Sequence, residues 1–134
     1  MAVRRLVGLF YEELWNAANV GIADEILHPD VSFRGSVGLG ARGRQQVCDY
    51  VAMVTSALAG YRCSVVELIV EDDRAAAKMR FTGVHAGEFL GYAPTGRPVE
   101  WMGAAFFAAD GDLLRDIWVL GDLVNLHAQL GAHS

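Results

Sequence analysis

The apolar residues of this chain change their spacing at Gly60, and this change constrains the fold more than any other feature. Before Gly60 apolar side chains recur every three or four residues, as on one face of a helix, and after it they alternate with polar ones, as along a strand. The alternating stretches cover residues 61–71, 74–84, 99–109 and 113–121, with turn residues between them. Strands that follow one another without intervening helices form an antiparallel meander and exclude a doubly wound parallel sheet. The chain is therefore predicted to be an α+β protein.

Three amphipathic helices are expected before these strands. Their apolar residues are Leu6, Val7, Phe10, Leu14 and Ala17 or Ala18 in the first, those of segment 22–27 in the second, and Val47, Tyr50 or Val51, Val54 and Leu58 in the third. We also expect a short strand at 31–35, no regular structure in the glycine-rich segment 35–43, and a closing helix at 123–130. Helices packed on one side of a curved antiparallel sheet leave a concave surface, and such a cone can hold a small apolar ligand.

The connection between the second and third strands of the meander, within residues 83–101, is unusually long. Hairpin loops usually take about two to five residues, so a longer loop is either functional or packed over other parts of the molecule. Phe89, Leu90 and Tyr92 give this loop apolar groups with which to pack. Two readings, a functional loop and a packed one, therefore stay open.

The composition narrows the classes of function. The 134 residues are enough for one domain, residues 1–134, and no apolar run approaches the roughly 20 residues that cross a bilayer. A net charge of −5 and a single lysine, Lys78, argue against a nucleic-acid partner, because phosphate binding needs clustered cations. Cys48 and Cys63 lack CxxC spacing and are expected to be reduced thiols, with a disulfide as the alternative. We expect no membrane partner, no metal site and a cytoplasmic location.

Three parts of the sequence carry a resemblance to a known family. They are Phe10-Tyr11-Glu12-Glu13-Leu14-Trp15-Asn16 with Ala23-Asp24-Glu25-Ile26-Leu27; His28-Pro29-Asp30 with Phe33-Arg34-Gly35; and Phe81-Thr82-Gly83-Val84-His85-Ala86-Gly87-Glu88-Phe89-Leu90-Gly91 with Pro94-Thr95-Gly96-Arg97. The ending Gln129-Leu130-Gly131 also fits. Together they resemble the SnoaL-like polyketide cyclase and ester cyclase family, which has the nuclear-transport-factor-2-like (NTF2-like) fold. The resemblance spans nearly the whole chain and implies an NTF2-like cone, a curved antiparallel sheet with three helices packed on it.

The resemblance also implies a chemistry. Family members studied as enzymes use no cofactor, act on polycyclic aromatic polyketide precursors and close a ring by intramolecular aldol condensation. One carboxylate in an apolar cavity removes a proton from a carbon flanked by carbonyl groups, and donors in the wall stabilise the enolate. In this chain the position of that carboxylate, next to the tryptophan of the last strand, is Val119, and an assisting histidine would fall near Ala104. Asp122 matches a second acidic position, where its alternative role is to cap the helix at 123–130.

Two residues are candidates for catalysis and six for substrate binding. The catalytic candidates are Asp122 and His85, since His85 lies where a strand becomes the long loop and can act as acid or base near neutral pH. Its alternative role is to tie the loop to a backbone carbonyl. The candidates for substrate binding are Tyr11, Trp15, Phe33, Glu88, Trp101 and Trp118. The aromatic ones could instead pack in the core, and Glu88 could be a solvated or loop-bracing carboxylate.

Alternation divides the last two strands into faces. Trp101, Gly103, Ala105 and Phe107 share one face of their strand, with Glu100, Met102, Ala104 and Phe106 on the other. Asp116, Trp118, Leu120 and Asp122 share one face of the last strand, with Ile117, Val119 and Gly121 on the other. The small residues near Trp101 predict room for a flat aromatic ligand.

These features favour a SnoaL-like, cofactor-free enzyme of secondary metabolism. It would act by acid/base chemistry on a small apolar polyketide-type ketone or ester, in an aldol-type cyclisation or a related tailoring step. Two alternatives stay open, because a fold does not fix a function: a tailoring hydroxylase, isomerase or epoxide hydrolase, and a non-catalytic small-molecule-binding or assembly domain. A homodimer is expected, formed through the sheet surface of residues 99–107.

Overall fold

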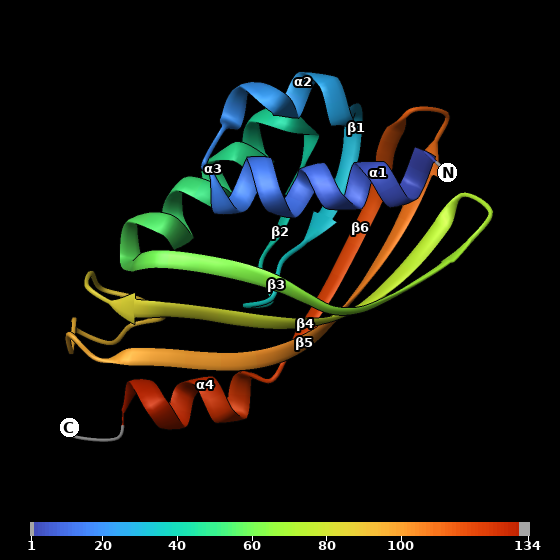
Figure 1. Cartoon of the computed structure of the whole chain (residues 1–134). Coiled ribbons are helices and arrows are strands. Elements are labelled where there is room, and N and C mark those ends of the chain that lie inside the picture. Colours follow the sequence, from blue (N-terminus) through green and yellow to red (C-terminus); the bar gives the residue numbers. More distant parts are fainter. Residues whose placement is uncertain (1, 132–134) are drawn as a thin grey trace.

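The computed structural model describes residues 2–131 (Figure 1). Its helices are α1 (Ala2–Leu9), the π-helix η1 (Phe10–Asn16), the single 3₁₀ turn η2 (Val20–Ile22), α2 (Ala23–Ile26), α3 (Gly43–Ala57) and α4 (Leu123–Leu130). Its strands are β1 (Leu27–Arg34), β2 (Gly40–Arg42), β3 (Leu58–Glu71), β4 (Arg74–His85), β5 (Pro98–Asp110) and β6 (Leu113–Gly121). This is the α+β order that the sequence predicts, except for β2, which lies in the glycine-rich segment expected to be irregular.

The strands form one curved sheet in the order β2-β1-β6-β5-β4-β3. The last four strands pair antiparallel in sequence order, which confirms the predicted meander. β1, however, runs parallel to β6, with Phe33 opposite Ile117, so the expected antiparallel arrangement is wrong for this pair. The reason is the path of the chain. After β1 and β2 it crosses through α3 to the far edge of the sheet, and the meander then returns to β1 from the other side.

The inner face of the sheet is covered by α1, α2 and α3, while α4 lies beside β5 (Figure 1). The register shifts twice along the β3–β4 pair and once between β5 and β6, and such irregularities increase the twist and bend a sheet. The two faces of β5 and β6 are those that alternation predicts. Phe107 and Val119 are buried against the helices, whereas Phe106 and Trp118 are 52% and 39% exposed on the outer face.

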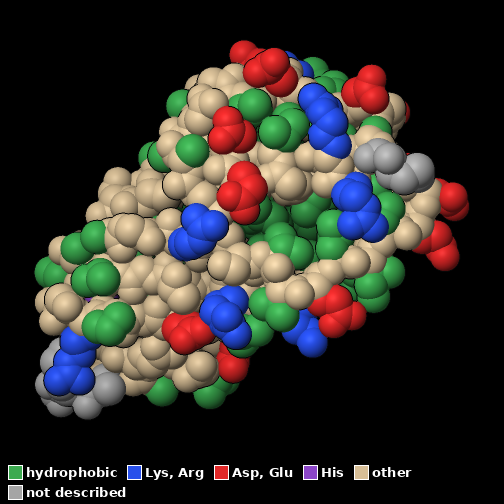
Figure 2. All heavy atoms as spheres, viewed as in Figure 1, with side chains coloured by type: hydrophobic (Ala, Val, Ile, Leu, Met, Phe, Trp, Pro, Cys, Tyr) green, Lys and Arg blue, Asp and Glu red, His purple; other side chains and the backbone are tan. Residues whose placement is uncertain are grey.

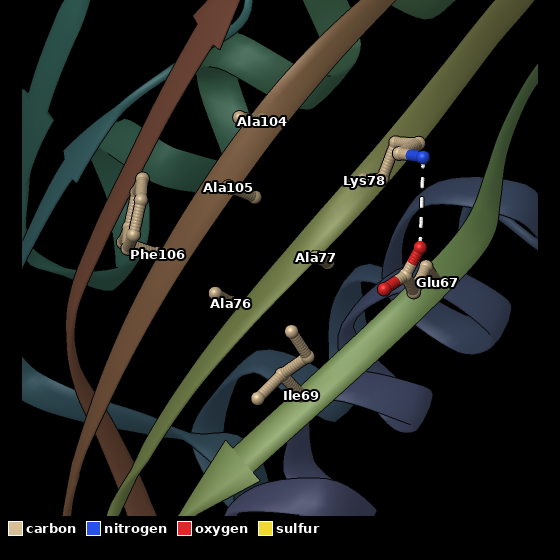
Figure 3. Close-up of a pocket in the computed structure, with 8 residues that line it drawn as sticks. All are labelled: Glu67, Ile69, Ala76, Ala77, Lys78, Ala104, Ala105 and Phe106. Atoms are coloured by element: carbon tan, nitrogen blue, oxygen red, sulfur yellow. Dashed lines mark ion pairs between the residues drawn. The ribbon is translucent and has the colours of Figure 1, made fainter.

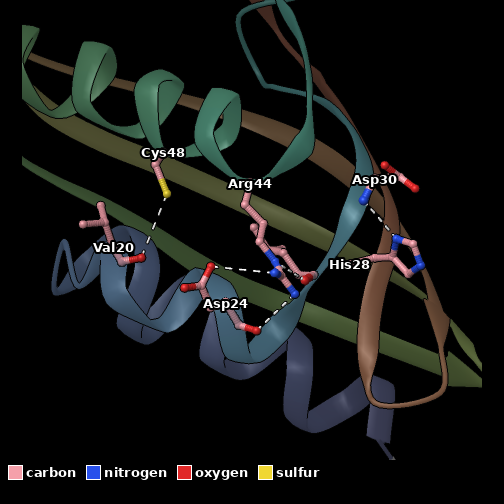
Figure 4. Close-up of polar contacts among 7 residues, drawn as sticks. Val20, Asp24, His28, Asp30, Arg44 and Cys48 are labelled. Atoms are coloured by element: carbon pink, nitrogen blue, oxygen red, sulfur yellow. Dashed lines mark hydrogen bonds and ion pairs between the residues drawn. The ribbon is translucent and has the colours of Figure 1, made fainter.

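Arg44 holds the helix layer together at the start of α3 (Figure 4). Its Nε donates to the Leu27 carbonyl oxygen at 2.8 Å, and Nη2 donates to the Asp24 carbonyl oxygen at 3.2 Å. The Asp24 carboxylate lies 3.8 Å from Nη1, but it is largely exposed, and an exposed ion pair adds little stability. Arg44 therefore acts mainly through its bonds to backbone carbonyls, which fix α3 relative to α2 and β1.

The long connection between β4 and β5 packs over one end of the cone. The amides of Ala86 and Gly87 both donate to the Ala57 carbonyl oxygen at 3.0 Å, so the loop is fastened to the end of α3. A Cβ at Gly87 would lie only 3.2 Å from the Ser56 carbonyl oxygen, so this approach needs glycine. Phe89 is buried and pairs with Tyr92 across a tight turn. The loop is therefore packed against the end of α3, as one of the two readings predicts.

α4 lies along the edge of β5 beyond the point where β6 ends. The Asp122 amide donates to the Met102 carbonyl oxygen at 2.9 Å, after which the chain leaves the edge of β5. The side-chain amide of Gln129 then bonds both the N–H of Glu100, at 2.9 Å, and its carbonyl oxygen, at 2.6 Å. One side chain thus satisfies backbone groups that a neighbouring strand would otherwise pair.

The charged residues of the helix-covered side are dispersed. In Figure 2, Lys and Arg side chains lie singly among Asp and Glu and form no continuous basic patch on the face shown. Within residues 2–131, no helix is long and apolar enough to cross a membrane. No three His, Cys, Asp or Glu residues of the same range come together in a group that could hold a metal ion.

Candidate functional site

The π-helix η1 carries two of the predicted binding residues into the cone. Its wide turns bury Phe10, Tyr11, Leu14 and Trp15 together. The Tyr11 ring packs edge-on against Phe107, with ring centroids 5.9 Å apart, and Trp15 lies 5.4 Å from Tyr61. π-Helices are rare and frequently occur at functional sites. The sequence predicts the inward edge formed by Tyr11 and Trp15, but not the π-helical geometry that produces it.

Phe33 and Trp101 reach the same interior from the sheet. Phe33 on β1 packs against Tyr50 at 5.0 Å between ring centroids, and Trp101 on β5 lies 5.3 Å from Phe81. Four of the six predicted binding residues, Tyr11, Trp15, Phe33 and Trp101, thus belong to one buried aromatic cluster. The room expected beside Trp101 is occupied, because a Cβ at Gly103 would lie 2.8 Å from the Phe81 ring.

A group of hydroxyl side chains, which sequence reasoning missed, lies among these rings. We call Ser36, Tyr50 and Tyr61 the hydroxyl cluster. The Tyr50 oxygen accepts a hydrogen bond from the Val37 amide at 3.3 Å, and Ser36 lies close enough to both phenols to lower their pKa. Ser36 lies in the glycine-rich segment after β1, Tyr50 on α3 and Tyr61 on β3. Tyr61 and Cys63 alternate with the charged Arg62, so the inward orientation of Tyr61 could have been predicted. No pattern in the sequence marks Ser36.

These hydroxyl groups are proton donors rather than bases. Burial raises the pKa of Tyr50 to about 12 and the pKa of Tyr61 well above its ordinary value, although hydrogen bonding to Ser36 lowers both slightly. Burial also raises the pKa of the neighbouring Cys63 thiol to about 12. Desolvation disfavours the charged form of each group, so all of them stay protonated near neutral pH.

Two glycines shape the space around the hydroxyl cluster. A Cβ at Gly35 would overlap the Tyr50 hydroxyl, and a Cβ at Gly121 would overlap the Ser36 carbonyl oxygen. The same Cβ at Gly121 would lie 3.1 Å from the indole nitrogen of Trp101. The indole N–H therefore points beside the Ser36 segment, and it has no hydrogen-bond partner within residues 2–131.

His85 is buried at the end of β4. Its Nδ1 lies 3.1 Å from the Thr95 hydroxyl, and its backbone bonds Arg97 and Gly96 across the base of the loop. The side chain thus ties the loop in place, but through the Thr95 hydroxyl and not through the backbone carbonyl expected in its alternative role. Its Nε2 is also buried and without a partner in the described part of the chain. Because a hydroxyl group can donate or accept, Thr95 allows Nε2 to present either a proton or a lone pair.

The remaining predicted residues lie outside the buried interior. Asp122 is exposed and caps α4, where its Oδ1 accepts a hydrogen bond from the Asn125 amide at 3.2 Å, so the predicted alternative role is confirmed. Glu88 is exposed in the loop. Trp118 lies on the outer face, where it contacts Phe106 and the Arg34 guanidinium lies 5.4 Å from its ring. Alternation correctly groups Trp118 with Asp122, but it does not say which face of a strand turns inward.

Val119 faces the core at the position where the resemblance places a carboxylate. It is only 4% exposed. Ala104, near the position of the assisting histidine, is exposed on the outer face. Among the described residues, the buried polar or charged ones apart from tyrosine and cysteine are Ser36 and His85, so no carboxylate is available inside this cone.

Residues 5–130 match the family of SnoaL-like polyketide cyclases, and the chain belongs to that family. It has the NTF2-like fold, with a curved, unclosed sheet. The chain is similar to TsrD from Streptomyces laurentii, with 27% identity, a TM-score of 0.85, and 98% of this chain and 96% of that chain covered. A proposed SnoaL-like polyketide cyclase from Jannaschia sp. CCS1 has 20% identity and a TM-score of 0.89, with 99% and 94% covered. AclR, a proposed hydroxylase from Streptomyces galilaeus, has 24% identity and a TM-score of 0.80, with 100% and 99% covered. None of the curated proteins matches the chain.

Proposed function

We propose that this chain is a cofactor-free enzyme of secondary metabolism that takes a small, flat, apolar ketone or ester into its cone. The observation that carries the proposal is that two buried polar atoms in the half of the cone near the end of β4, His85 Nε2 and Trp101 Nε1, have no partner among residues 2–131, in an interior otherwise lined by aromatic rings. Tyr11 Oη is also without a described partner, but it lies toward the other end of β4, where its ring packs on Phe107. Buried polar groups are nearly always paired, and leaving one unpaired costs about 1–3 kcal/mol. Oxygen atoms on an aromatic ligand would form hydrogen bonds with such groups, and the rings of the ligand would pack against the aromatic side chains of the interior.

The acid/base step is assigned to His85. It is a buried imidazole, and its Nε2 lies on the opposite side of the ring from the Thr95 contact. In the proposed step Nε2 takes a proton from the carbon next to the ligand carbonyl, and neutral donors in the wall stabilise the enolate oxygen. Asp122 has no part in this step, because it caps α4 at the surface.

A second candidate function, a non-catalytic small-molecule-binding domain, is favoured by one observation. Val119 stands where the cyclases hold their carboxylate, so the strongest base of the family chemistry is missing. The two candidates predict the same ligand but different behaviour of its acidic protons.

Proton exchange separates these functions. A panel of aromatic keto esters is incubated in heavy water with wild type, His85→Gln and Asp122→Asn, and deuterium at the acidic carbon is followed by NMR. We expect catalysed exchange that is lost in His85→Gln and kept in Asp122→Asn. Bound ligand with no exchange above that of buffer would identify a binding domain, and exchange that survives in His85→Gln would remove His85 from the step.

We also propose that two copies of the chain pair through the outer face of the sheet. This face holds a groove of about 380 Å³ between Ile69 and Phe106 over the small side chains of β4 and β5 (Figure 3). Ile69, Phe106 and Leu120 are 62%, 52% and 50% exposed, which is unusual for large apolar side chains placed together.

A second copy suits this face because its charges are balanced. The ion pairs Lys78–Glu67, at 3.5 Å, and Arg80–Glu100, at 2.8 Å, lie exposed on the same outer face. These two pairs carry two charges of each sign, so this part of the face can meet its copy without net repulsion. Sedimentation at micromolar concentration should give a dimer for wild type and a monomer for Phe106→Glu. A monomeric wild type would contradict this proposal.

A further inference from the structure

We propose that the hydroxyl cluster and the Trp101 indole N–H form the subsite that receives the ligand's oxygen, and that the group bound there is an uncharged aryl or conjugated carbonyl. The inference rests on the proposed function, because it requires a ligand inside the cone. It adds the residues that orient the ligand and the chemical class of the group they recognise.

The donors converge from three sides of the cone. Tyr50 comes from the helix layer, Tyr61 from β3 and Ser36 from the segment after β1, and Ser36 lies close enough to both phenols to lower their pKa. The Val37 N–H occupies one lone pair of the Tyr50 oxygen, which leaves the phenolic proton free for another acceptor. An acceptor oxygen placed at Ser36 could therefore take hydrogen bonds from more than one hydroxyl group.

Trp101 adds a donor that nothing else in the described chain uses. Its N–H is buried without a partner, and Gly121 brings it beside the Ser36 segment because no side chain separates them. The Trp101 ring also packs against the Tyr61 ring, with centroids 6.0 Å apart, so an oxygen bound at the indole N–H would lie at the edge of these two rings. An indole N–H only donates, so the missing partner must be an acceptor.

The protonation state of the subsite selects a neutral acceptor. The phenols stay protonated near neutral pH, so they donate hydrogen bonds to a carbonyl oxygen and polarise it without removing a proton. No Lys, Arg, Asp or Glu is among the buried residues described. The Arg34 guanidinium lowers the pKa of Tyr50, but it is only partly buried, bonds the Val119 carbonyl oxygen and lies over Trp118, so it is already engaged outside the ring-lined interior. Burying an unpaired charge is far more costly than burying a carbonyl.

The test compares two probes of similar shape, 2-acetylnaphthalene and 2-isopropylnaphthalene, of which only the first has an acceptor oxygen. Their dissociation constants are measured by fluorescence for wild type, Tyr61→Phe, Ser36→Ala and the control Tyr92→Phe, a tyrosine on the outer loop. The two probes differ in the cost of removing them from water. Because this difference is the same for every protein, it cancels when the ratio of the two dissociation constants is compared between proteins. We expect Tyr61→Phe and Ser36→Ala to weaken binding of the ketone relative to the hydrocarbon by about tenfold. Tyr92→Phe should leave the ratio of the two dissociation constants unchanged.

An infrared measurement provides a second readout. The carbonyl stretch of the ¹³C-labelled ketone should move to lower frequency in wild type and return toward its value in a hydrocarbon solvent in Tyr61→Phe. This readout also works on wild type alone, where an unshifted band overturns the subsite even if a variant fails to fold. If both probes bind and every protein gives the same ratio, the subsite is wrong while the proposed function stands. If neither probe binds to wild type, the proposed function itself fails.

Discussion

Replacing Val119 by aspartate tests whether water reaches the interior of the cone and whether a carboxylate at this position acts as a general base. Val119 is 4% exposed on the inner face of β6, opposite Ala105, and it stands where the resemblance places the cyclase carboxylate. The substitution Val119→Asp removes the buried apolar surface of one valine, worth about 1.5–3 kcal/mol, and buries a carboxyl group at a further cost of about 1–3 kcal/mol. We expect the variant to lose about 3–5 kcal/mol of unfolding free energy and to remain folded if wild type is of ordinary stability.

The loss of unfolding free energy in Val119→Asp should increase as the pH rises. Burial raises the pKa of the introduced carboxyl group above its value in the unfolded chain, about 4. The folded state then binds the proton more tightly, so the destabilisation is smallest below pH about 4. It grows by about 1.4 kcal/mol per pH unit as the pH rises toward the folded pKa. Val119→Asn introduces an amide of similar size that does not titrate, so its destabilisation should not vary with pH.

The assay is urea unfolding of wild type, Val119→Asp and Val119→Asn from pH 5 to pH 8, followed by deuterium exchange of the keto ester panel. A carboxyl group with a raised pKa is an effective general base near neutral pH, so we expect Val119→Asp to exchange at least about tenfold faster than wild type. Equal destabilisation of the two variants at every pH would refute the reasoning, since it would mean that water reaches position 119 and that the cone is not dry.

Three further predictions address the scaffold. Ala18 follows η1 with φ of 52°, so Ala18→Gly should raise the unfolding free energy by about 1 kcal/mol, and a lower melting temperature would count against strain there. Gln129→Ala should cost about 1–2 kcal/mol in urea unfolding, because both backbone groups of Glu100 lose a partner, and an unchanged midpoint would show that water replaces the side chain. Burial raises the pKa of Tyr50 to about 12, so its contribution to stability is complete below pH about 10 and is lost as the pH rises through about 12. Unfolding of Tyr50→Phe should show a weaker alkaline loss than wild type, and an identical loss would assign the effect to other groups.

Most of the fold could be predicted because it follows from local periodicity. The change of period at Gly60 gives the helices and the meander, and alternation gives the two faces of β5 and β6. The parallel pairing of β1 with β6 could not be predicted, because it depends on where the two ends of the sheet meet rather than on any local pattern. β2 has three residues, the first of them Gly40, and Gly43 follows it, so it forms through pairing with β1 and not through its own propensity.

The candidate site was predictable only where its residues lie on one regular element. Tyr11 and Trp15 are four residues apart and share a helical face, and Trp101 follows the inward phase of its strand. Trp118 has the same kind of pattern but lies on the outer face, since a period of two does not distinguish inside from outside. Ser36 lies outside any helix or strand and meets Tyr50 and Tyr61 only in the folded protein.

The loss of the carboxylate at Val119 and the aromatic filling of the cone are physically connected. A cyclase carboxylate needs water or a hydrogen-bond partner when it is buried, which favours an open or wet cavity. With valine at this position the interior can pack dry, and the rings of Tyr61, Phe81 and Trp101 do so at centroid distances of 5.3 to 6.5 Å. In a dry interior each remaining donor interacts more strongly with an acceptor than it would near water. Under the proposed function, proton removal therefore passes from a carboxylate to His85, neutral donors polarise the carbonyl, and a ligand that supplies the oxygen must displace ring contacts to enter.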